Sequence, residues 1–348
     1  MRWILALILL TIPAQAQELV KDFGTGPATM TLRSTTDLAV MGPVVADYIA
    51  LHPDLRVRYE QWGSNDLHDL SVAECAAGKG GADLVISSAV HQMVHLVNEG
   101  CARPHRSALT ASLPSALRWR DELWGVTEEP AVMVYNRDLV PADDVPASRF
   151  DLLDLLRPAD SPYVGRIATY DIEASGLGYL LAFADSLEAT TFGGLMESFG
   201  RSGAIATCCS AEIIDAVVRG EYLIAYNVLG SYALARAAEE PRVGVVAPAD
   251  YTLVLSRAAM IPRSAAAPQA AADLVDFLLS QAGRAALKRA LLIVPLEEEA
   301  GAPDLPDSVA SIRRPIELTP ALLLALDAQK RALFGARWRA SFPPKVQQ

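Results

Sequence analysis

After its first sixteen residues, the sequence lacks a second apolar run of about 18 residues, the length that crosses a membrane. It also lacks basic character, because 41 Asp and Glu outnumber 30 Lys and Arg, for a formal net charge of −11. This balance argues against a nucleic-acid partner, since phosphate backbones bind basic surfaces. It does not exclude a small anionic ligand, because a local cradle of donors can oppose the overall field.

Recognisable catalytic motifs are also missing. The chain has no Gly-x-Ser-x-Gly elbow, no P-loop, and no nucleophile beside a base. Glu128 and Glu129 are adjacent, so on a strand they point to opposite faces and form no catalytic dyad. His91 and His95 have the spacing of metal ligands on a helix, but no third ligand is apparent, and we interpret them as a surface pair. We therefore expect a protein that is not an enzyme and holds no cofactor or metal ion.

Residues 1–16 have the pattern of a cleaved export signal. A basic start precedes the apolar run from Trp3 to Ile12, which is too short to span a bilayer. Ala14 and Ala16 then occupy positions −3 and −1 of a cleavage site that opens the mature chain at Gln17. No cysteine follows the apolar run, so lipid attachment is not expected. The pattern predicts a freely diffusing periplasmic protein.

Four cysteines are present, an even number that favours disulfides in an oxidising compartment. Cys75 lies near the end of one predicted helix and Cys101 just past the end of the next, and we favour this pair among the three connectivities. Cys208 and Cys209 are adjacent, and a bridge between neighbours needs strained geometry. We expect two thiols facing opposite sides of a strand, one buried and one exposed. A redox role is the alternative, although no Lys, Arg or His lies near them in sequence to lower a thiol pKa.

Strand and helix patterns alternate along most of the chain. Three strand–helix units fill residues 29–100, and the second helix begins after Gly63 while the first begins at Pro43. Alternation resumes at 166–170 and continues to about residue 290. Units of this kind form parallel sheets with right-handed crossovers and helices on both faces. The fold class is therefore α/β, with two doubly wound units.

Three predicted strands end in turns rich in hydroxyls and glycine. These turns are Ser34, Thr35 and Thr36; Ser87 and Ser88; and Ser175, Gly176 and Gly178. Each offers backbone amides at the positive end of a helix, where anions bind. For a single turn, the simpler interpretation is that the hydroxyls cap their own helix. Three such turns on separate strands predict a shared anion-facing cleft, since ligands of open α/β sheets bind at the carboxyl ends of strands.

The chain resembles a known family at six places that follow one another in order. These are residues 32–37 (Leu-Arg-Ser-Thr-Thr-Asp), 81–85, 134–139, 172–179 (Ile-Glu-Ala-Ser-Gly-Leu-Gly-Tyr), 220–222 and 276–280. Together they resemble the type II periplasmic solute-binding proteins of the ferric-iron-type subgroup. The resemblance implies two α/β lobes joined by crossover strands, with a ligand clamped between them. We place lobe 1 at 17–130 and 251–348, and lobe 2 at 131–250.

The resemblance also implies a set of ligand-binding residues. We expect hydroxyl, amide and small residues of both lobes to line the cleft: Ser34, Thr35, Thr36, Ser87, Ser88, Ser175, Gly176, Gly178, Asn227, Ser231, Tyr232 and Tyr251. Iron-binding members carry adjacent tyrosines where this chain has Gly230 and Ser231. Hydroxyl and glycine donors suit a small carboxylate or phosphorylated acid instead.

We therefore expect a monomer that captures a small anionic metabolite and presents it to an inner-membrane ABC permease or a sensor histidine kinase. One alternative is a receptor for ferric iron or a ferric chelate, with Tyr179, Tyr232 and Tyr251 as phenolate ligands. A more distant alternative is an exported hydrolase that uses one of the serines.

Overall fold

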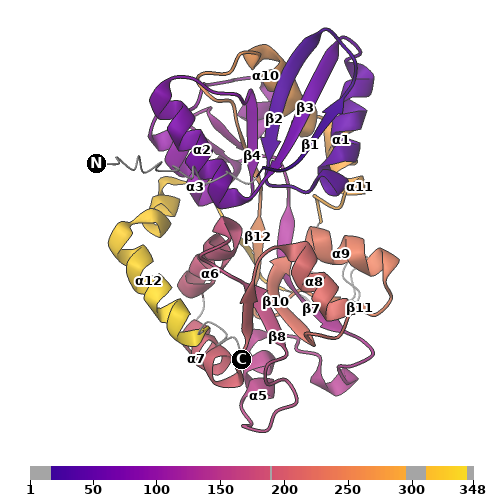
Figure 1. Cartoon of the computed structure of the whole chain (residues 1–348), viewed down its shortest axis with the longest axis vertical. Helices are drawn as coiled ribbons and strands as arrows, with labels where there is room; N and C mark the ends of the chain where they lie inside the picture. Colours follow the sequence, from indigo (N-terminus) through magenta and orange to yellow (C-terminus); the bar gives the residue numbers. More distant parts are fainter. Residues whose placement is uncertain (1–16, 189, 295–310, 343–348) are drawn as a thin grey trace, which may run out of the picture.

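The computed structural model describes residues 17–188, 190–294 and 311–342, and these form two α/β lobes (Figure 1). The expected export signal lies outside the described residues. The strands are β1 (Gln17–Phe23), β2 (Ala28–Ser34), β3 (Leu55–Trp62), β4 (Leu84–Ser87), β5 (Arg118–Trp119), β6 (Leu123–Gly125), β7 (Glu129–Asn136), β8 (Ile167–Tyr170), β9 (Ile205–Thr207), β10 (Ile224–Leu229), β11 (Val243–Val246), β12 (Thr252–Leu255), β13 (Ala258–Met260) and β14 (Arg313–Pro315).

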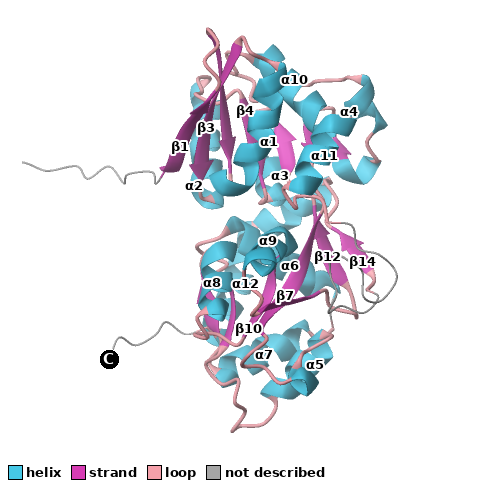
Figure 2. Ribbon diagram, turned by 90° about the vertical axis from the view of Figure 1, so that its right-hand side faces the viewer, coloured by secondary structure: helices cyan, strands magenta, loops and turns pink. Residues whose placement is uncertain are grey.

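Helices surround both sheets (Figure 2). The first lobe carries α1 (Leu38–Leu51), α2 (Ser64–Ala77), α3 (Val90–Asn98), α4 (Ala108–Ser112), α10 (Pro268–Leu279) and α11 (Gln281–Arg289). The second lobe carries α5 (Arg149–Leu156), α6 (Gly176–Glu188), α7 (Phe192–Ser202), α8 (Ser210–Val218), α9 (Gly230–Glu239) and α12 (Ala328–Ser341). Short 3-10 turns are η1 (Ser115–Leu117), η2 (Ala142–Asp144) and η3 (Pro320–Leu326). No described helix combines the length and the apolar character that a membrane crossing requires.

The first lobe is built on a sheet of strand order β1-β3-β2-β4-β13-β6-β5. Its centre is parallel, because β2 pairs with β3 and β4 in that sense. All four residues of β4 are buried, as expected for a strand covered by helices on both faces. The predicted α/β fold is therefore confirmed, with antiparallel strands added at the edge and at the crossover.

The second lobe has a sheet of order β14-β12-β7-β10-β8-β9, and β11 also pairs with β7. The long strand β7 enters this sheet directly from the first lobe, and β12 leads back to β13 of the first lobe. These two adjacent, antiparallel crossovers place the hinge next to the carboxyl end of β10. The space between the lobes therefore has the crossovers at its base.

The C-terminal part of the chain differs from the expected division. Residues from 251 onward were assigned to lobe 1, but β12 and β14 pair within the second sheet. Trp338 of α12 is buried in the hydrophobic cluster of the second lobe, and Figure 1 shows α12 lying along that lobe. Trp338 thus packs α12 against the second lobe, while Arg331 and Arg339 of the same helix are exposed.

Cys75 and Cys101 form a disulfide, as the sequence predicts. It joins the end of α2 to the residue that follows the turn after α3. The bridge closes a loop with a sequence separation of 26 residues, which stabilises the first lobe chiefly by restricting its unfolded chain.

Candidate functional site

A cleft with a cavity volume of about 100 Å³ lies between the two lobes. Both lobes and the second crossover contribute to its walls. It is lined by Glu18, Thr35, Asp37, Trp62, Gly63, Ser64, Ser88, Tyr170, Ala174, Ser175, Leu177, Cys208, Cys209, Ser210, Ala211, Leu229, Tyr232 and Arg257.

In the first lobe, the two predicted hydroxyl turns divide between cleft and interior. Thr35 and Ser88 line the cleft, and their side-chain oxygens are 3.1 Å apart. Ser34 and Thr36 are fully buried and bond to each other, with Ser34 Oγ accepting from the Thr36 amide at 3.0 Å. Ser87 is buried and accepts from the amide two residues on. Three of the five hydroxyls therefore stabilise the turns that present the other two.

The second lobe contributes the predicted turn before α6. Ser175 lines the cleft and its Oγ accepts a hydrogen bond from the Gly178 amide at 3.0 Å. The Gly176 amide donates to Ser64 Oγ of the first lobe at 2.9 Å. A Cβ on Gly176 would lie 2.7 Å from the Gln92 side chain, so glycine permits this close approach of the lobes. The turn thus serves both the cleft and the contact between lobes.

Asp37 and Asn65 of the first lobe make further hydrogen bonds to the second lobe around the cleft. The Asp37 amide donates to the Tyr232 hydroxyl at 3.1 Å, and Asn65 Nδ2 donates to the carbonyl of Glu173 at 3.0 Å. Tyr232 therefore lies in the cleft as the sequence predicts, at a point where the lobes touch. These contacts describe a closed arrangement of the two lobes.

Ser231 was predicted to line the cleft, but it is buried behind the cleft wall, where it takes part in a network that the sequence did not reveal. Its hydroxyl donates to the carboxylate of Glu129, which also binds the Arg257 guanidinium at 2.8 Å. Arg257 is 1% exposed, lines the cleft, and donates to the Thr35 carbonyl at 3.4 Å. An arginine of the second crossover thus reaches the cleft with a carboxylate of the first crossover behind it.

Asn227 and Tyr251 were expected in the cleft, but the structure places both inside the second lobe. Asn227 is buried, has a φ of 63°, and lies beside α6 and α7. The Tyr251 hydroxyl donates to the buried carboxylate of Asp185, and its ring lies 3.6 Å from the Arg149 guanidinium. Because Arg149 and Asp185 need polar partners in the interior, Tyr251 is turned away from the cleft.

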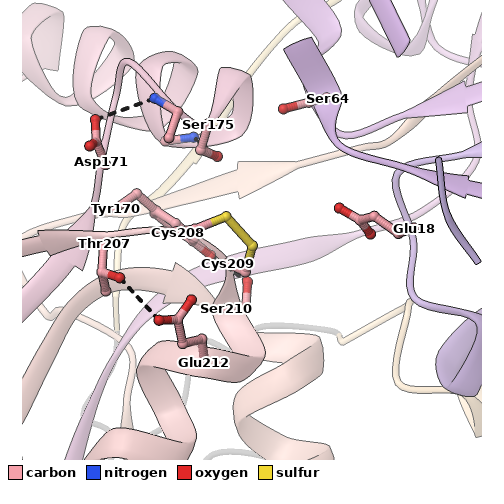
Figure 3. Close-up of a disulfide and its surroundings, with 12 residues drawn as sticks. Glu18, Ser64, Tyr170, Asp171, Ser175, Thr207, Cys208, Cys209, Ser210 and Glu212 are labelled. Atoms are coloured by element: carbon pink, nitrogen blue, oxygen red, sulfur yellow. Dashed lines mark hydrogen bonds between the residues drawn. A yellow bond between two sulfur atoms is a disulfide. The ribbon is translucent and has the colours of Figure 1, made fainter. Parts of the chain in front are cut away.

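Cys208 and Cys209 form a disulfide between neighbours, so the expectation of two separate thiols is wrong. Both residues line the cleft, and Cys209 precedes the first turn of α8. A bridge between neighbouring cysteines needs an unusual backbone conformation, and Cys209 supplies it with a φ of 41°. Figure 3 shows the two sulfur atoms between Tyr170 on one side and Ser64 and Glu18 of the first lobe on the other.

Six helices begin at the cleft. Residues at or immediately before the N-termini of α1, α2, α3, α6, α8 and α9 line it: Asp37, Gly63, Ser88, Ser175, Cys209 and Leu229. Each helix N-terminus contributes the positive end of a helix dipole, although some of the first amides already bind side chains, as Leu38 does with Gln61 and Gly176 with Ser64. The positive ends of six helix dipoles, three from each lobe, therefore form a cradle around the cleft.

The ionisable side chains of the cleft add both negative and positive charge beside the helix N-termini. Burial raises the pKa of the Asp37 carboxyl, while the nearby Arg257 guanidinium lowers it, and the net shift is upward. Burial raises the pKa of Tyr170 to about 12, so this residue remains a neutral phenol at neutral pH. Glu18 accepts a hydrogen bond from Gln61 at 2.7 Å.

The three tyrosines of the iron alternative do not converge. Tyr232 lines the cleft, Tyr251 is turned into the second lobe, and the Tyr179 hydroxyl donates to the Ala325 carbonyl at 2.7 Å. Across the described ranges, no group of three or more His, Cys, Asp and Glu side chains is placed to hold a metal ion. The expected surface pair is also wrong, because His91 is 1% exposed and packs beside Tyr179.

Several residues that line the cleft were not predicted from the sequence. Arg257 lies between β12 and β13, and Trp62 and Tyr170 end β3 and β8, and no local pattern marks these three side chains as residues of a cleft. The Gly63-Ser64 turn after β3 is the exception, since it has the same strand–turn–helix pattern as the turns that were singled out. Inspecting every such turn would have added Ser64 to the predicted site.

Comparisons with known proteins agree with this architecture. A chain described as the substrate-binding protein of an ABC transporter from Agrobacterium tumefaciens is 32% identical, with 93% of this chain and 98% of that chain covered and a TM-score of 0.84. AfuA from Actinobacillus pleuropneumoniae, solved with fructose-6-phosphate, has 14% identity, coverage of 91% and 99%, and a TM-score of 0.68. Iron-bound HitA from Pseudomonas aeruginosa has 20% identity, coverage of 76% and 85%, and a TM-score of 0.62. No curated protein sequence matches the chain.

The family model described as bacterial extracellular solute-binding protein matches residues 34–290, which include every residue that lines the cleft except Glu18. The two-lobed fold, the crossovers at the base of the cleft and this match lead to one conclusion. The chain belongs to the bacterial extracellular solute-binding proteins that serve ABC transporters.

Proposed function

We propose that this protein captures a small anionic metabolite, a carboxylate or a phosphorylated acid, in the cleft between its lobes. The closed, loaded form would then be read by an ABC permease or by a membrane sensor kinase. The observation that carries the proposal is the convergence of six helix N-termini on one cleft. Acid groups are the ligands that such amides bind best, through charge-assisted hydrogen bonds.

The charges around the cleft favour an anion when their magnitudes are compared. Glu18 and Asp37 contribute negative charge and Arg257 contributes positive charge, so the formal sum is about −1 when both acids are ionised. Each of the six helix N-termini adds a partial positive charge, up to about half a unit where its first amides are free and less where side chains already bind them. Protonation of Asp37, which its raised pKa favours, shifts the balance further and adds a hydrogen-bond donor.

The contacts between lobes connect binding to closure. Gly176 and Ser64, whose hydrogen bond joins the lobes, both belong to turns at the cleft. A ligand that touches donors of both lobes stabilises the closed arrangement by its differential affinity for that state. A permease or sensor that recognises the surfaces of both lobes together would thereby distinguish loaded from empty protein.

The direct test is calorimetric titration of the mature chain with four probes: inorganic phosphate, citrate, fructose-6-phosphate and ferric chloride. We expect saturable binding of at least one of the three anions and an affinity that falls as salt concentration rises, because exposed charges are screened. Tight binding of ferric ion with no binding of any anion would contradict the proposal and favour the iron alternative.

A charge-matched pair of variants tests the helix N-termini themselves. Ser88→Asp places a carboxylate at the start of α3 inside the cleft, whereas Ser112→Asp adds the same charge at an exposed position of α4. We expect Ser88→Asp to weaken anion binding at least tenfold through like-charge repulsion at short range, about 1.4 kcal/mol or more. Equal affinities of the two variants would show that the anion does not bind at this cradle.

A further inference from the structure

The disulfide between Cys208 and Cys209 has no assigned role in the binding of a solute. It differs from the Cys75–Cys101 bridge in sequence separation, which is 1 against 26, so it closes no loop of the unfolded chain. The loop-closure stabilisation of an ordinary disulfide is therefore absent. Its place in the molecule instead points to the cleft, which both of its residues line.

The bridge is accessible from the cleft. Cys209 is exposed and Cys208 is half-buried, whereas Cys101 of the other bridge is 6% exposed. Figure 3 shows the sulfur atoms facing the open side of the second lobe, opposite Ser64 and Glu18. With Leu177 and Leu229 they give the cleft an apolar, polarisable wall beside the helix N-termini.

The bridge also fixes the backbone that leads into α8. Cys209 has a φ of 41°, a region that residues other than glycine rarely adopt, and it is the N-cap of this helix. Its carbonyl accepts the hydrogen bond of the Ile213 amide at 3.1 Å. The eight-membered ring that joins the two cysteines restrains this conformation, so the orientation of the first amides of α8 depends on the bridge.

A chain of hydrogen bonds carries this orientation to the next helix. Ser210, the first residue of α8, bonds through its hydroxyl to the Tyr170 hydroxyl. Tyr170 in turn accepts from the Leu229 amide at 3.3 Å, immediately before α9. Two of the three N-termini that the second lobe presents to the cleft are therefore linked through the turn that the disulfide holds.

We propose that the Cys208–Cys209 disulfide is a ligand-binding element of the second lobe, which presents the first turn of α8 to the acid group and packs against the apolar part of the ligand, so that its reduction weakens binding. This inference rests on the proposed function. An external dithiol supplies two electrons and two protons: the bond between the sulfurs breaks, two thiols form, and the dithiol becomes a disulfide. Cys209 then relaxes toward negative φ, and the amides of α8 turn out of position.

The experiment uses the Cys75→Ala/Cys101→Ala double variant, in which Cys208–Cys209 is the single possible bridge within the chain. This protein is titrated with phosphate, citrate and fructose-6-phosphate before and after reduction by an excess of a dithiol. We expect reduction to weaken the binding of each probe that binds at least tenfold, the effect of one lost hydrogen bond to a charged group. The Cys208→Ala/Cys209→Ala double variant should show the same loss, with Cys75–Cys101 intact.

Affinity within twofold of the oxidised protein in both the reduced and the Cys208→Ala/Cys209→Ala forms would overturn the inference. Hydrogen exchange gives a second readout that needs no ligand. Reduction should accelerate exchange at the amides of residues 210–213 and at Leu229, and unchanged exchange there would also overturn it. If no anion binds even the oxidised protein, the proposed anionic ligand fails, while the exchange result still decides whether the disulfide holds the first turn of α8.

Discussion

Two buried arginines, Arg149 and Arg257, show how one chemical group serves two purposes in this fold. Arg149 is 0% exposed and binds Asp185 at 3.0 Å, and all of its partners belong to the second lobe. Arg257 is 1% exposed and binds Glu129 at 2.8 Å, but it also faces the cleft and the first lobe. The first arginine ties one lobe together, whereas the second stands where a ligand and both lobes meet.

Both arginines have a raised pKa, so they differ in their position in the fold and not in their charge. Burial lowers the pKa of each guanidinium, but surrounding oxygens more than compensate. For Arg149 these are Tyr226 and Asp185, and for Arg257 chiefly Glu129. Both arginines therefore stay charged. The comparison predicts that removing Arg149 damages stability alone, while removing Arg257, which also leaves a buried carboxylate, damages binding as well as stability.

The largest expected effect is on stability at Arg149. Arg149→Met leaves Asp185 as an uncompensated buried carboxylate, and we expect the free energy of unfolding to fall by about 3–5 kcal/mol. Arg157→Met is a suitable control, because that side chain is exposed at the end of the same helix, α5. Urea denaturation measures both, and calorimetry should show that the folded Arg149→Met protein binds its anion as the wild type does. A loss of less than about 1 kcal/mol would mean that the pair contributes little beyond packing.

At Arg257 the expected effect is on affinity. Arg257→Met removes the single guanidinium that lines the cleft within the described chain, and we expect anion binding to weaken on the order of 100-fold. The companion variant Glu129→Gln keeps hydrogen-bonding atoms for Ser231 but removes the counter-charge. It should strengthen anion binding while reducing stability. Titration calorimetry measures the anion affinity of both variants. Equal affinity in Arg257→Met and wild type would mean that the ligand binds away from the crossover.

A third buried base, His91, extends the comparison to a group without a counter-charge. Burial chiefly, together with the electrostatic influence of His68, Arg331 and His95, lowers the pKa of His91 to about 3. The Tyr179 ring, not a carboxylate, packs against it. In the described structure, His91 Nδ1 has no hydrogen-bond partner. This histidine is therefore neutral in the folded protein at neutral pH.

The unfolded chain binds a proton at His91 near pH 6.5, but the folded protein does so only near pH 3. Stability therefore falls as pH decreases through this window, by about 2 kcal/mol between pH 7 and pH 5. His91→Asn should remove this part of the pH dependence, whereas His105→Asn, a histidine paired with Asp276, should not. Urea denaturation at pH 7 and pH 5 measures this change. An equal fall in the free energy of unfolding between the two pH values for wild type and His91→Asn would refute the prediction.

The sequence predicted what depends on local patterns. Alternating strands and helices indicated both α/β lobes, and two cysteines at successive helix ends indicated Cys75–Cys101. Contacts between distant segments were not predictable. Glu129 and Arg257 are separated by 128 residues, and no local pattern relates them. Likewise α1 was expected to start at Pro43 but begins at Leu38, because the Asp37 and Leu38 amides find partners on Tyr232 and Gln61.

The hydroxyl turns could be predicted only in part from the sequence. Their place at the ends of strands was apparent from the sequence, but the use of each hydroxyl was not. Ser34 and Ser87 bond within their turns, while Thr35 and Ser88 face the cleft, and strand geometry alone did not decide which would do which. Capping and ligand binding use the same chemistry, so only the surroundings distinguish them.

Ser175 both caps its own helix and lines the cleft. Its replacement is expected to have the smallest effect of the variants considered. Its Oγ accepts the Gly178 amide at the start of α6, and the residue lines the cleft. Ser175→Ala should lower stability by about 1 kcal/mol, the usual cost of a lost cap. Ser186→Ala, later in the same helix, removes a hydroxyl that donates to the Phe183 carbonyl and should leave anion binding unchanged. If Ser175 also touches the ligand, its variant weakens binding several-fold, about 1 kcal/mol, as well as stability. A change in stability with unaltered affinity would mean that Ser175, like Ser34 and Ser87, serves only its own turn.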